Sequence, residues 1–141
     1  MKKQSTNNGI IKSLFILSFL GLSFFPTELF AQKHEVLING KITKIRNTAD
    51  PNDNTCTALS TIKTVGLTIP NKDSIKINVM LIQHHHPVGE KIFYSVKDLN
   101  SFDMGSWIKL NYDKSKATPT DRIFIEVQEG KGLFYNVYFC K

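Results

Sequence analysis

Residues 122–140 read RIFIEVQEGKGLFYNVYFC, two runs rich in β-branched and aromatic residues on either side of a polar, glycine-containing segment. Runs of this composition and length, bounded by turn formers, are typical of β-strands. Glu129-Gly-Lys-Gly132 has the residues that a tight turn needs. This stretch therefore predicts an antiparallel hairpin of two strands, Arg122 to Gln128 and Leu133 to Cys140.

The sequence before this hairpin has the same character. No long stretch shows the apolar spacing of three to four residues that marks an amphipathic helix, so we expect an all-β protein. Further strands are expected at Glu35 to Asn47, Ile62 to Ile69, Ser74 to Ile82, Lys91 to Lys97 and Ser106 to Tyr112. Pro70-Asn-Lys-Asp73 predicts a second hairpin, between the second and third of these. A helical turn near Asp98 to Phe102, capped by Asp98 or Ser101, is also expected.

The first of these strands changes its apolar face along its length. Val36, Ile38 and Ile42 share one parity and Ile45 has the other, which predicts a bulge or a bend near Gly40. A long bent strand, a hairpin and a later strand at Trp107 to Tyr112 resemble, in architecture only, small Greek-key barrels of the oligonucleotide/oligosaccharide-binding (OB) type. The fold class expected is a small antiparallel OB-like barrel, and a small sandwich is the alternative.

The N-terminus has the order of a cleaved export signal. Lys2 and Lys3 precede an uncharged apolar run from Ser13 to Phe25, which is too short to span a bilayer as a helix. Pro26 follows the run, and Ala31 is a small residue of the kind found before a cleavage site. We therefore expect residues 1–31 to be a cleaved signal peptide, with no permanent membrane anchor and with the mature protein secreted or periplasmic.

Residues 32–141 have a length typical of one small domain, and we expect a single β domain there. The whole chain has a formal net charge of +6. Part of this excess leaves with the signal peptide, and the remaining basic residues are spread along the chain. Such a distribution suits solubility and does not indicate a nucleic-acid partner.

Cys56 and Cys140 are the two cysteines of the sequence. An even pair in a small exported domain indicates a disulfide, and two free thiols are the alternative. The bridge would close most of the mature chain into one loop.

Aromatic side chains give one candidate binding site. The last strand is apolar on both faces, so one face packs on the core while Phe134 and Tyr138 need a cover or a ligand. Phe124 on the neighbouring strand extends that face, and Trp107 is a further aromatic candidate. Such rings stack on sugars or fill pockets of a protein partner. The alternative is a central strand covered by a loop.

The triplet His84-His85-His86 gives a second candidate site. If the strand that contains Met80 continues through it, alternation places Met80, His84 and His86 on one face. Imidazole and thioether ligands suit copper, and imidazole alone also suits zinc. The alternative is a polar turn before Pro87.

No residue pattern indicates catalysis, because the chain has no nucleophile motif and no suitably spaced acid pair. We therefore expect no enzyme and no catalytic residues. The expected function is that of an exported, non-catalytic binding domain for a protein or carbohydrate ligand, with no cofactor required. A copper- or zinc-binding protein is the alternative, and a protease inhibitor using the loop Asn47 to Thr55 is a third possibility.

Overall fold

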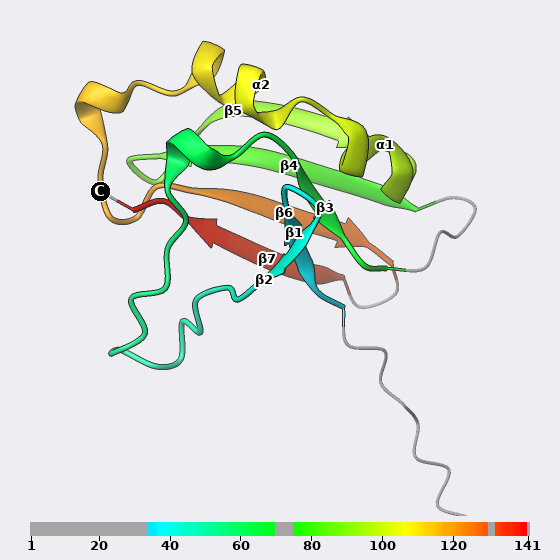
Figure 1. The fold of residues 1–141 in the computed structure, drawn as a ribbon, viewed down its shortest axis with the longest axis horizontal. Helices are drawn as coiled ribbons and strands as arrows, with labels where there is room; N and C mark the ends of the chain where they lie inside the picture. Colours follow the sequence, from blue (N-terminus) through cyan, green and yellow to red (C-terminus); the bar gives the residue numbers. More distant parts are fainter. Residues whose placement is uncertain (1–33, 70–74, 130–131, 141) are drawn as a thin grey trace, which may run out of the picture. The chain divides into compact units, whose positions relative to one another are not determined.

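The computed structural model describes residues 34–69, 75–129 and 132–140, which are mostly β and form two antiparallel sheets with few helices (Figure 1). The expected signal peptide, residues 1–31, lies outside the described residues. The small sheet has the order β2-β1-β3, with β1 at Val36–Ile38, β2 at Lys41–Thr43 and β3 at Val65–Leu67. The large sheet has the order β5-β4-β6-β7, with β4 at Lys76–Gln83, β5 at His86–Phe93, β6 at Arg122–Gln128 and β7 at Leu133–Tyr138.

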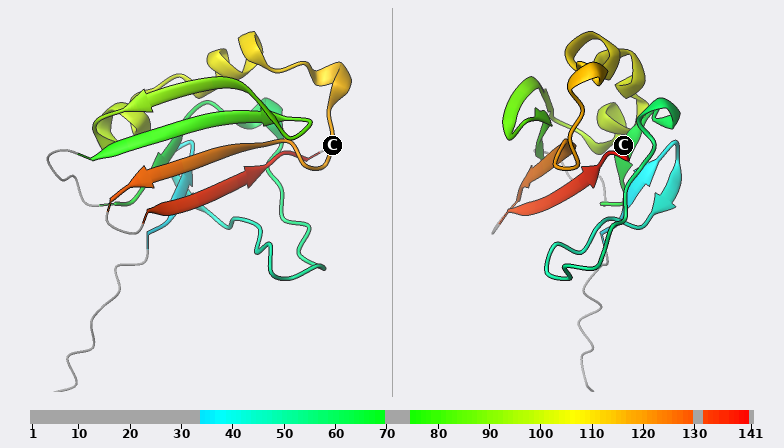
Figure 2. Two further views of the ribbon diagram at one scale, coloured as in Figure 1. Left: turned by 180° about the vertical axis from the view of Figure 1, so that it is seen from behind. Right: turned by 90° about the vertical axis from the view of Figure 1, so that its left-hand side faces the viewer.

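Helices α1 (Val96–Ser101) and α2 (Met104–Asn111) connect β5 to β6, and short 3₁₀ turns lie at Leu59–Thr61 (η1) and Lys114–Lys116 (η2). Figure 2 shows the helices and the small sheet on the same side of the large sheet. In the described ranges, no helix is both long and apolar enough to cross a membrane.

The expected hairpin of β6 and β7 is confirmed, with Ile125 opposite Tyr135. The hairpin expected around residues 70–73 is wrong. Strand β3 pairs with β1 in the small sheet, whereas β4 pairs with β5 on one edge and with β6 on the other. Both edges of β4 are therefore taken, and β3 has no place beside it. Residues 70–73 themselves lie outside the described residues.

The expected long first strand is two short strands. Asn39 and Gly40 both have positive φ, at 53° and 75°, and Ile38 pairs with Lys41 across them. Positive φ at both central residues is characteristic of a two-residue hairpin turn, for which Asn-Gly is a preferred sequence. The change of parity before Ile45 thus reflects a hairpin rather than a bulge.

The strand expected at Ser106 to Tyr112 is wrong, because this segment belongs to α2. Asp103 caps the helix by accepting a hydrogen bond from the backbone N–H of Ser106 at 3.0 Å. Met104, Trp107 and Ile108 are buried at helical spacing, which places them on one face of α2. Without this strand, and with the first strand split, the described residues form no closed barrel, and the OB-like barrel is wrong. They support the sandwich-like alternative.

The helical turn expected near Asp98 is present as α1, but neither Asp98 nor Ser101 caps it. Ser95 lies before the helix and its side chain accepts a hydrogen bond from the backbone N–H of Asp98 at 3.0 Å. Farther along, Asn100 accepts a hydrogen bond from the N–H of Leu67 at 3.0 Å. Helix α1 thereby satisfies an edge group of β3 and ties the small sheet to the helices.

The core lies between the large sheet and the elements on its inner side. Every second residue of β4, β6 and β7 faces this side, as strand periodicity requires. Buried sheet residues and buried residues of the helices and the small sheet form a single hydrophobic cluster. It includes Ile77, Val79, Leu81, Ile123, Ile125, Val127, Tyr135 and Val137 from the sheet, and Val36, Val65, Leu67, Leu99, Met104 and Ile108 from the other side.

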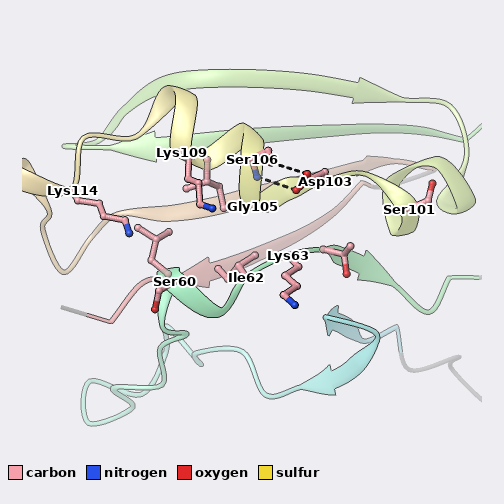
Figure 3. A pocket seen from close by; sticks show the side chains of 12 residues that line it. Ser60, Ile62, Lys63, Ser101, Asp103, Gly105, Ser106, Lys109 and Lys114 are labelled. Carbon is pink, nitrogen blue, oxygen red and sulfur yellow. Dashed lines mark hydrogen bonds between the residues drawn. The ribbon is translucent and has the colours of Figure 1, made fainter.

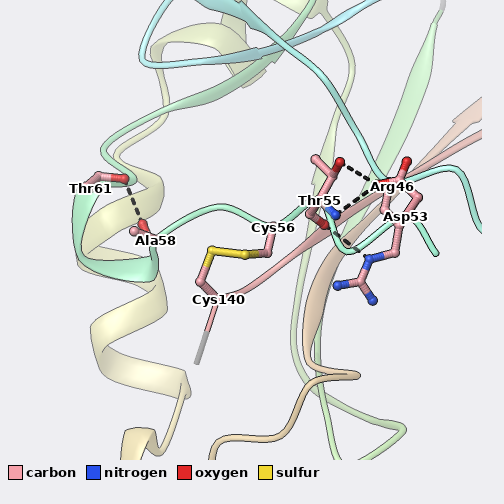
Figure 4. Close-up of a disulfide and its surroundings, with 7 residues drawn as sticks. All are labelled: Arg46, Asp53, Thr55, Cys56, Ala58, Thr61 and Cys140. Carbon is pink, nitrogen blue, oxygen red and sulfur yellow. Dashed lines mark hydrogen bonds between the residues drawn. A yellow bond between two sulfur atoms is a disulfide. The ribbon is translucent and has the colours of Figure 1, made fainter.

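The Cys56–Cys140 disulfide is present, with Cα atoms 5.0 Å apart (Figure 4). Next to it, the backbone of Thr57 donates to Tyr138 O at 2.8 Å and accepts from the N–H of Cys140 at 3.0 Å. The segment that precedes η1 is therefore fastened to the last strand by both covalent and hydrogen bonds.

Candidate functional site

The candidate site is the outer face of the large sheet, which we define as the face opposite the helices. Its side chains alternate with those of the core, and most are half-buried or exposed. They come from all four strands, and the larger ones are Met80, Ile92, Phe124, Phe134 and Tyr138, with Asn78, Glu90, Arg122, Glu126 and Asn136 between them.

Two phenylalanines dominate this face. The ring centroids of Phe124 on β6 and Phe134 on β7 are 5.7 Å apart, and the rings are inclined by only 25°. Phe134 is 56% exposed although it is a large apolar residue. Phe124 pairs with Asn136 and Phe134 pairs with Glu126, so the two rings meet on a diagonal of the strand ladder. The expected approach of these two side chains on one face is therefore what the structure shows.

Tyr138 lies on the same face, but its ring is occupied. The guanidinium of Arg46 lies 4.3 Å from the ring centroid and that of Arg122 lies 5.7 Å from it. Arg46 also donates to Thr55 O at 3.1 Å, and Arg122 donates to Asn136 Oδ1 at 2.9 Å. Tyr138 thus holds the loop before Cys56 against the sheet, and it forms the border of the aromatic surface rather than its centre.

Strand β5 adds apolar area that the sequence did not predict. Ile92 is 44% exposed and pairs with Asn78 on the outer face. Asn78 donates to Glu90 at 2.9 Å, which fixes a polar pair beside Met80. The strand was expected only from Lys91 onward, so Glu90 was missed. The available signal was weak: Val88 and Ile92 share one parity, but Glu90 lies between them at the same parity.

Trp107 does not belong to this surface. It lies on α2, is 7% exposed, and contacts the ring of Phe102 with centroids 6.2 Å apart. A Cβ added at Gly89 would be 2.9 Å from the Trp107 ring, so α2 packs closely on β5 at this glycine. Trp107 is therefore a packing residue between the helices and the sheet.

The histidine triplet forms a turn instead of a strand end. β4 ends at Gln83, which pairs with His86, and His84 and His85 between them have φ of 51° and 66°. The alternation that was expected to place Met80, His84 and His86 on one face stops at this turn. The His84 ring contacts the backbone oxygen of Lys116.

Within the described ranges, no three His, Cys, Asp or Glu side chains are grouped as metal ligands. Copper or zinc binding at Met80, His84 and His86 stays a prediction.

A buried carboxylate supports the histidine turn. Asp121 is fully buried, and its two oxygens accept from the N–H of His84 at 3.0 Å, the hydroxyl of Tyr112 at 2.7 Å, and both the N–H and hydroxyl of Thr118 at 2.9 and 2.6 Å. Burial alone would raise the pKa of Asp121, but these hydrogen bonds outweigh it and hold the pKa below its usual value. Burial and the bond to Asp121 raise the pKa of Tyr112. All of these hydrogen bonds come from groups of the same chain, so we interpret Asp121 as a residue that stabilises the fold.

No protein-family model matches the chain, and comparison with curated proteins and with solved structures found no match. The geometry described above therefore carries the functional argument.

Proposed function

We propose that residues 32–141 act, after export, as a non-catalytic binding domain whose outer sheet face contacts a protein partner. The observation that carries this proposal is the stacked pair of Phe124 and Phe134 on an open sheet face, with Phe134 56% exposed. Exposing a large apolar ring to water is unfavourable, and burying it against a partner would lower the free energy of the complex.

The composition of the outer face favours a protein over a carbohydrate. It combines Phe, Met, Tyr and Arg, the residue types that are enriched where proteins meet. The two rings also stack on each other, inclined by 25°, so each covers part of a ring face that a sugar would otherwise use. Polar groups at the border, such as Glu90 and Arg122, would give orientation and specificity.

Export is supported by two features. Residues 1–31 have the basic, apolar and small-residue order of a signal peptide, and the Cys56–Cys140 disulfide suits an oxidising compartment such as the periplasm or the extracellular medium. The intact mass of protein recovered from medium or periplasmic extract tests this part. A chain starting near Gln32 is expected, and full-length protein held in the membrane would contradict it.

Site-specific photo-crosslinking tests the binding surface. A photoreactive phenylalanine analogue is placed at Phe134, and in a control protein at Leu110, which is 85% exposed on α2. We expect a discrete protein adduct from position 134 in exporting cells and none from position 110. Substituting Phe124→Ser should abolish the adduct, whereas Tyr94→Ser, at an exposed site after β5, should not.

Other outcomes would change or end the proposal. A folded protein without any adduct from position 134 would contradict it. Glycan binding that is lost on Phe134→Ala would replace the protein partner with a carbohydrate. An adduct with twice the mass of the mature chain would identify the partner as a second copy.

A further inference from the structure

A second surface lies on the helical side of the molecule. A pocket of about 450 Å³ opens between α2 and residues 59–64, the segment that contains η1 and leads into β3 (Figure 3). This volume lies within the range of small-molecule sites. The pocket shares no residue with the outer face of the large sheet.

A backbone contact fixes the separation of the two walls. The N–H of Gly105 in α2 donates to Lys63 O at 3.1 Å. A Cβ at Gly105 would lie 2.6 Å from Ile62 O, so a side chain there would push α2 away from the segment. Glycine at this position allows the close approach, and the pocket forms beside it.

The pocket has an apolar floor and a basic rim. Leu59 is half-buried and contributes apolar surface, whereas Ile62 and Ile108 are each 3% exposed and close the floor from the buried core. Three lysines line the opening, namely Lys63, Lys109 and Lys114. Figure 3 shows the amines of Lys109 and Lys114 directed into the space between α2 and residues 60–62.

In the part of the chain that the structure describes, none of these lysines forms an ion pair, although the charge of Lys109 contributes to lowering the pKa of Asp103. Asp103 lines the pocket, but it accepts the N–H and the hydroxyl of Ser106 at 3.0 and 2.7 Å and is committed to capping α2. Its single charge leaves the pocket positive. The amides of Gly105, Ser106 and Trp107 are also bonded, so the lysines are the positively charged groups that line the pocket and can bind an anion.

We propose that this pocket binds a small amphipathic organic anion, with its apolar body against Leu59, above the buried Ile62 and Ile108, and its oxyanion between Lys109 and Lys114. A carboxylate, a sulfate ester and a phosphate ester share the chemistry that two ammonium groups recognise. The apolar floor distinguishes such a ligand from a bare inorganic ion.

The test is a titration of the mature protein, residues 32–141, followed by amide chemical shifts. The probes are octanoate, octyl sulfate and octyl phosphate, with 1-octanol as a neutral probe of the same chain and acetate as an anion without the apolar body. We expect saturable shifts confined to residues 59–64 and 101–114 for the anionic octyl probes. Octanol and acetate should each bind roughly tenfold more weakly or not at all, because each lacks one of the two interactions.

Charge-matched variants separate this site from a general attraction for anions. Lys109→Gln with Lys114→Gln should raise the Kd for octanoate roughly tenfold. Lys41→Gln with Lys97→Gln removes the same charge from exposed positions outside the pocket and should leave the Kd within about twofold.

Equal affinity for octanol and octanoate, an unchanged Kd in the pocket variant, or shifts centred on residues 122–138 would overturn the proposal. A preference for octyl phosphate or octyl sulfate over octanoate would support it and identify the oxyanion. The crosslinking result at Phe134 is independent of all these outcomes.

Discussion

Asp121 is the residue on which the most polar contacts of the described core converge. Its carboxylate joins three separate parts of the chain: the β4–β5 turn at His84, the end of α2 at Tyr112 and the loop before β6 at Thr118. Only an ionised carboxylate can accept all four of these hydrogen bonds, because a protonated one would turn one oxygen into a donor facing donors. The charge is buried, and it is stabilised because every lone-pair direction is used.

Replacing Asp121→Asn should destabilise the protein by about 2 to 3 kcal/mol at neutral pH, since an amide nitrogen would face donors and buried donors would lose their acceptor. Urea unfolding followed by tryptophan fluorescence measures this. Asp98→Asn, at an exposed position in α1, is the matched control and should change stability by less than about 0.5 kcal/mol. Equal stability of the Asp121→Asn protein and the parent would show that the buried bonds contribute nothing net.

Asp121 should also make the stability of the protein depend on pH, and the direction of its pKa shift determines the direction of that dependence. Its pKa is lowered on folding, so its contribution is fully present above the unfolded value of about 3.9 and is lost as pH falls through the lower folded value. The stability difference between the parent and Asp121→Asn should therefore shrink below about pH 4. Asp103 and Asp113 also have lowered pKa values, from hydrogen bonds with Ser106 and Ser115, so both proteins lose stability in acid.

At the scale of elements, the turn of the β4–β5 hairpin has a backbone conformation that is unusual for its residues. A two-residue turn with positive φ at both positions usually carries Asn-Gly, yet here it carries His84-His85. Side chains with a Cβ are strained in this region. Contacts outside the turn hold it: Asp121 accepts the N–H of His84, and Gln83 bonds the backbone of Asp113 at 2.7 and 3.2 Å through its side-chain N and O atoms.

Substituting His85→Gly should raise stability by about 0.5 to 1 kcal/mol, because glycine adopts positive φ without a Cβ clash. The thermal unfolding midpoint at a pH where histidine is neutral measures the change. His86→Gly is the control in the adjacent strand, where glycine weakens the structure by about the same amount. A loss of stability in His85→Gly would mean that the His85 side chain makes a favourable contact that outweighs the strain.

The success of sequence-based prediction differed between elements for physical reasons. β6 and β7 were predicted because both strands have typical strand composition and are separated in the sequence only by a short, glycine-containing turn segment. α2 was missed because Trp107, Ile108 and Tyr112 favour strands individually, whereas their burial in this fold follows helical spacing with Met104. The pairing of β4 with β6 could not be predicted from local sequence patterns, because β5 and both helices lie between the two strands in the sequence.

The candidate site shows the same division. Phe124, Phe134 and Tyr138 were placed on one face because strand alternation is a local rule. Trp107 does not lie on that face, because the segment expected as a strand is helix α2. The basic pocket could not be foreseen, since residues 59–64 and 101–114 are far apart in the sequence and are brought together by tertiary packing, which includes the close approach of α2 at Gly105.

At the scale of the whole molecule, the disulfide is the longest covalent constraint. Cys56 and Cys140 are separated by 84 positions, and the loop they close contains both helices and the entire large sheet. A cross-link of this span restricts the unfolded chain far more than the folded one, with an ideal contribution of about 4 to 5 kcal/mol. In the folded state, the backbone bonds of Thr57 to Tyr138 and Cys140 join the same two segments as the disulfide does.

Replacing both cysteines, Cys56→Ser with Cys140→Ser, should therefore leave the fold intact but lower its free energy of unfolding by about 2 to 4 kcal/mol. The slope of that free energy with urea should rise, because an unfolded chain without the cross-link exposes more surface. Reduction of the parent with dithiothreitol should reproduce both changes, and reduction of the variant should do nothing further. A lower midpoint without a change in slope would place the effect in the folded state, and an unchanged midpoint would contradict a stabilising role for the bridge.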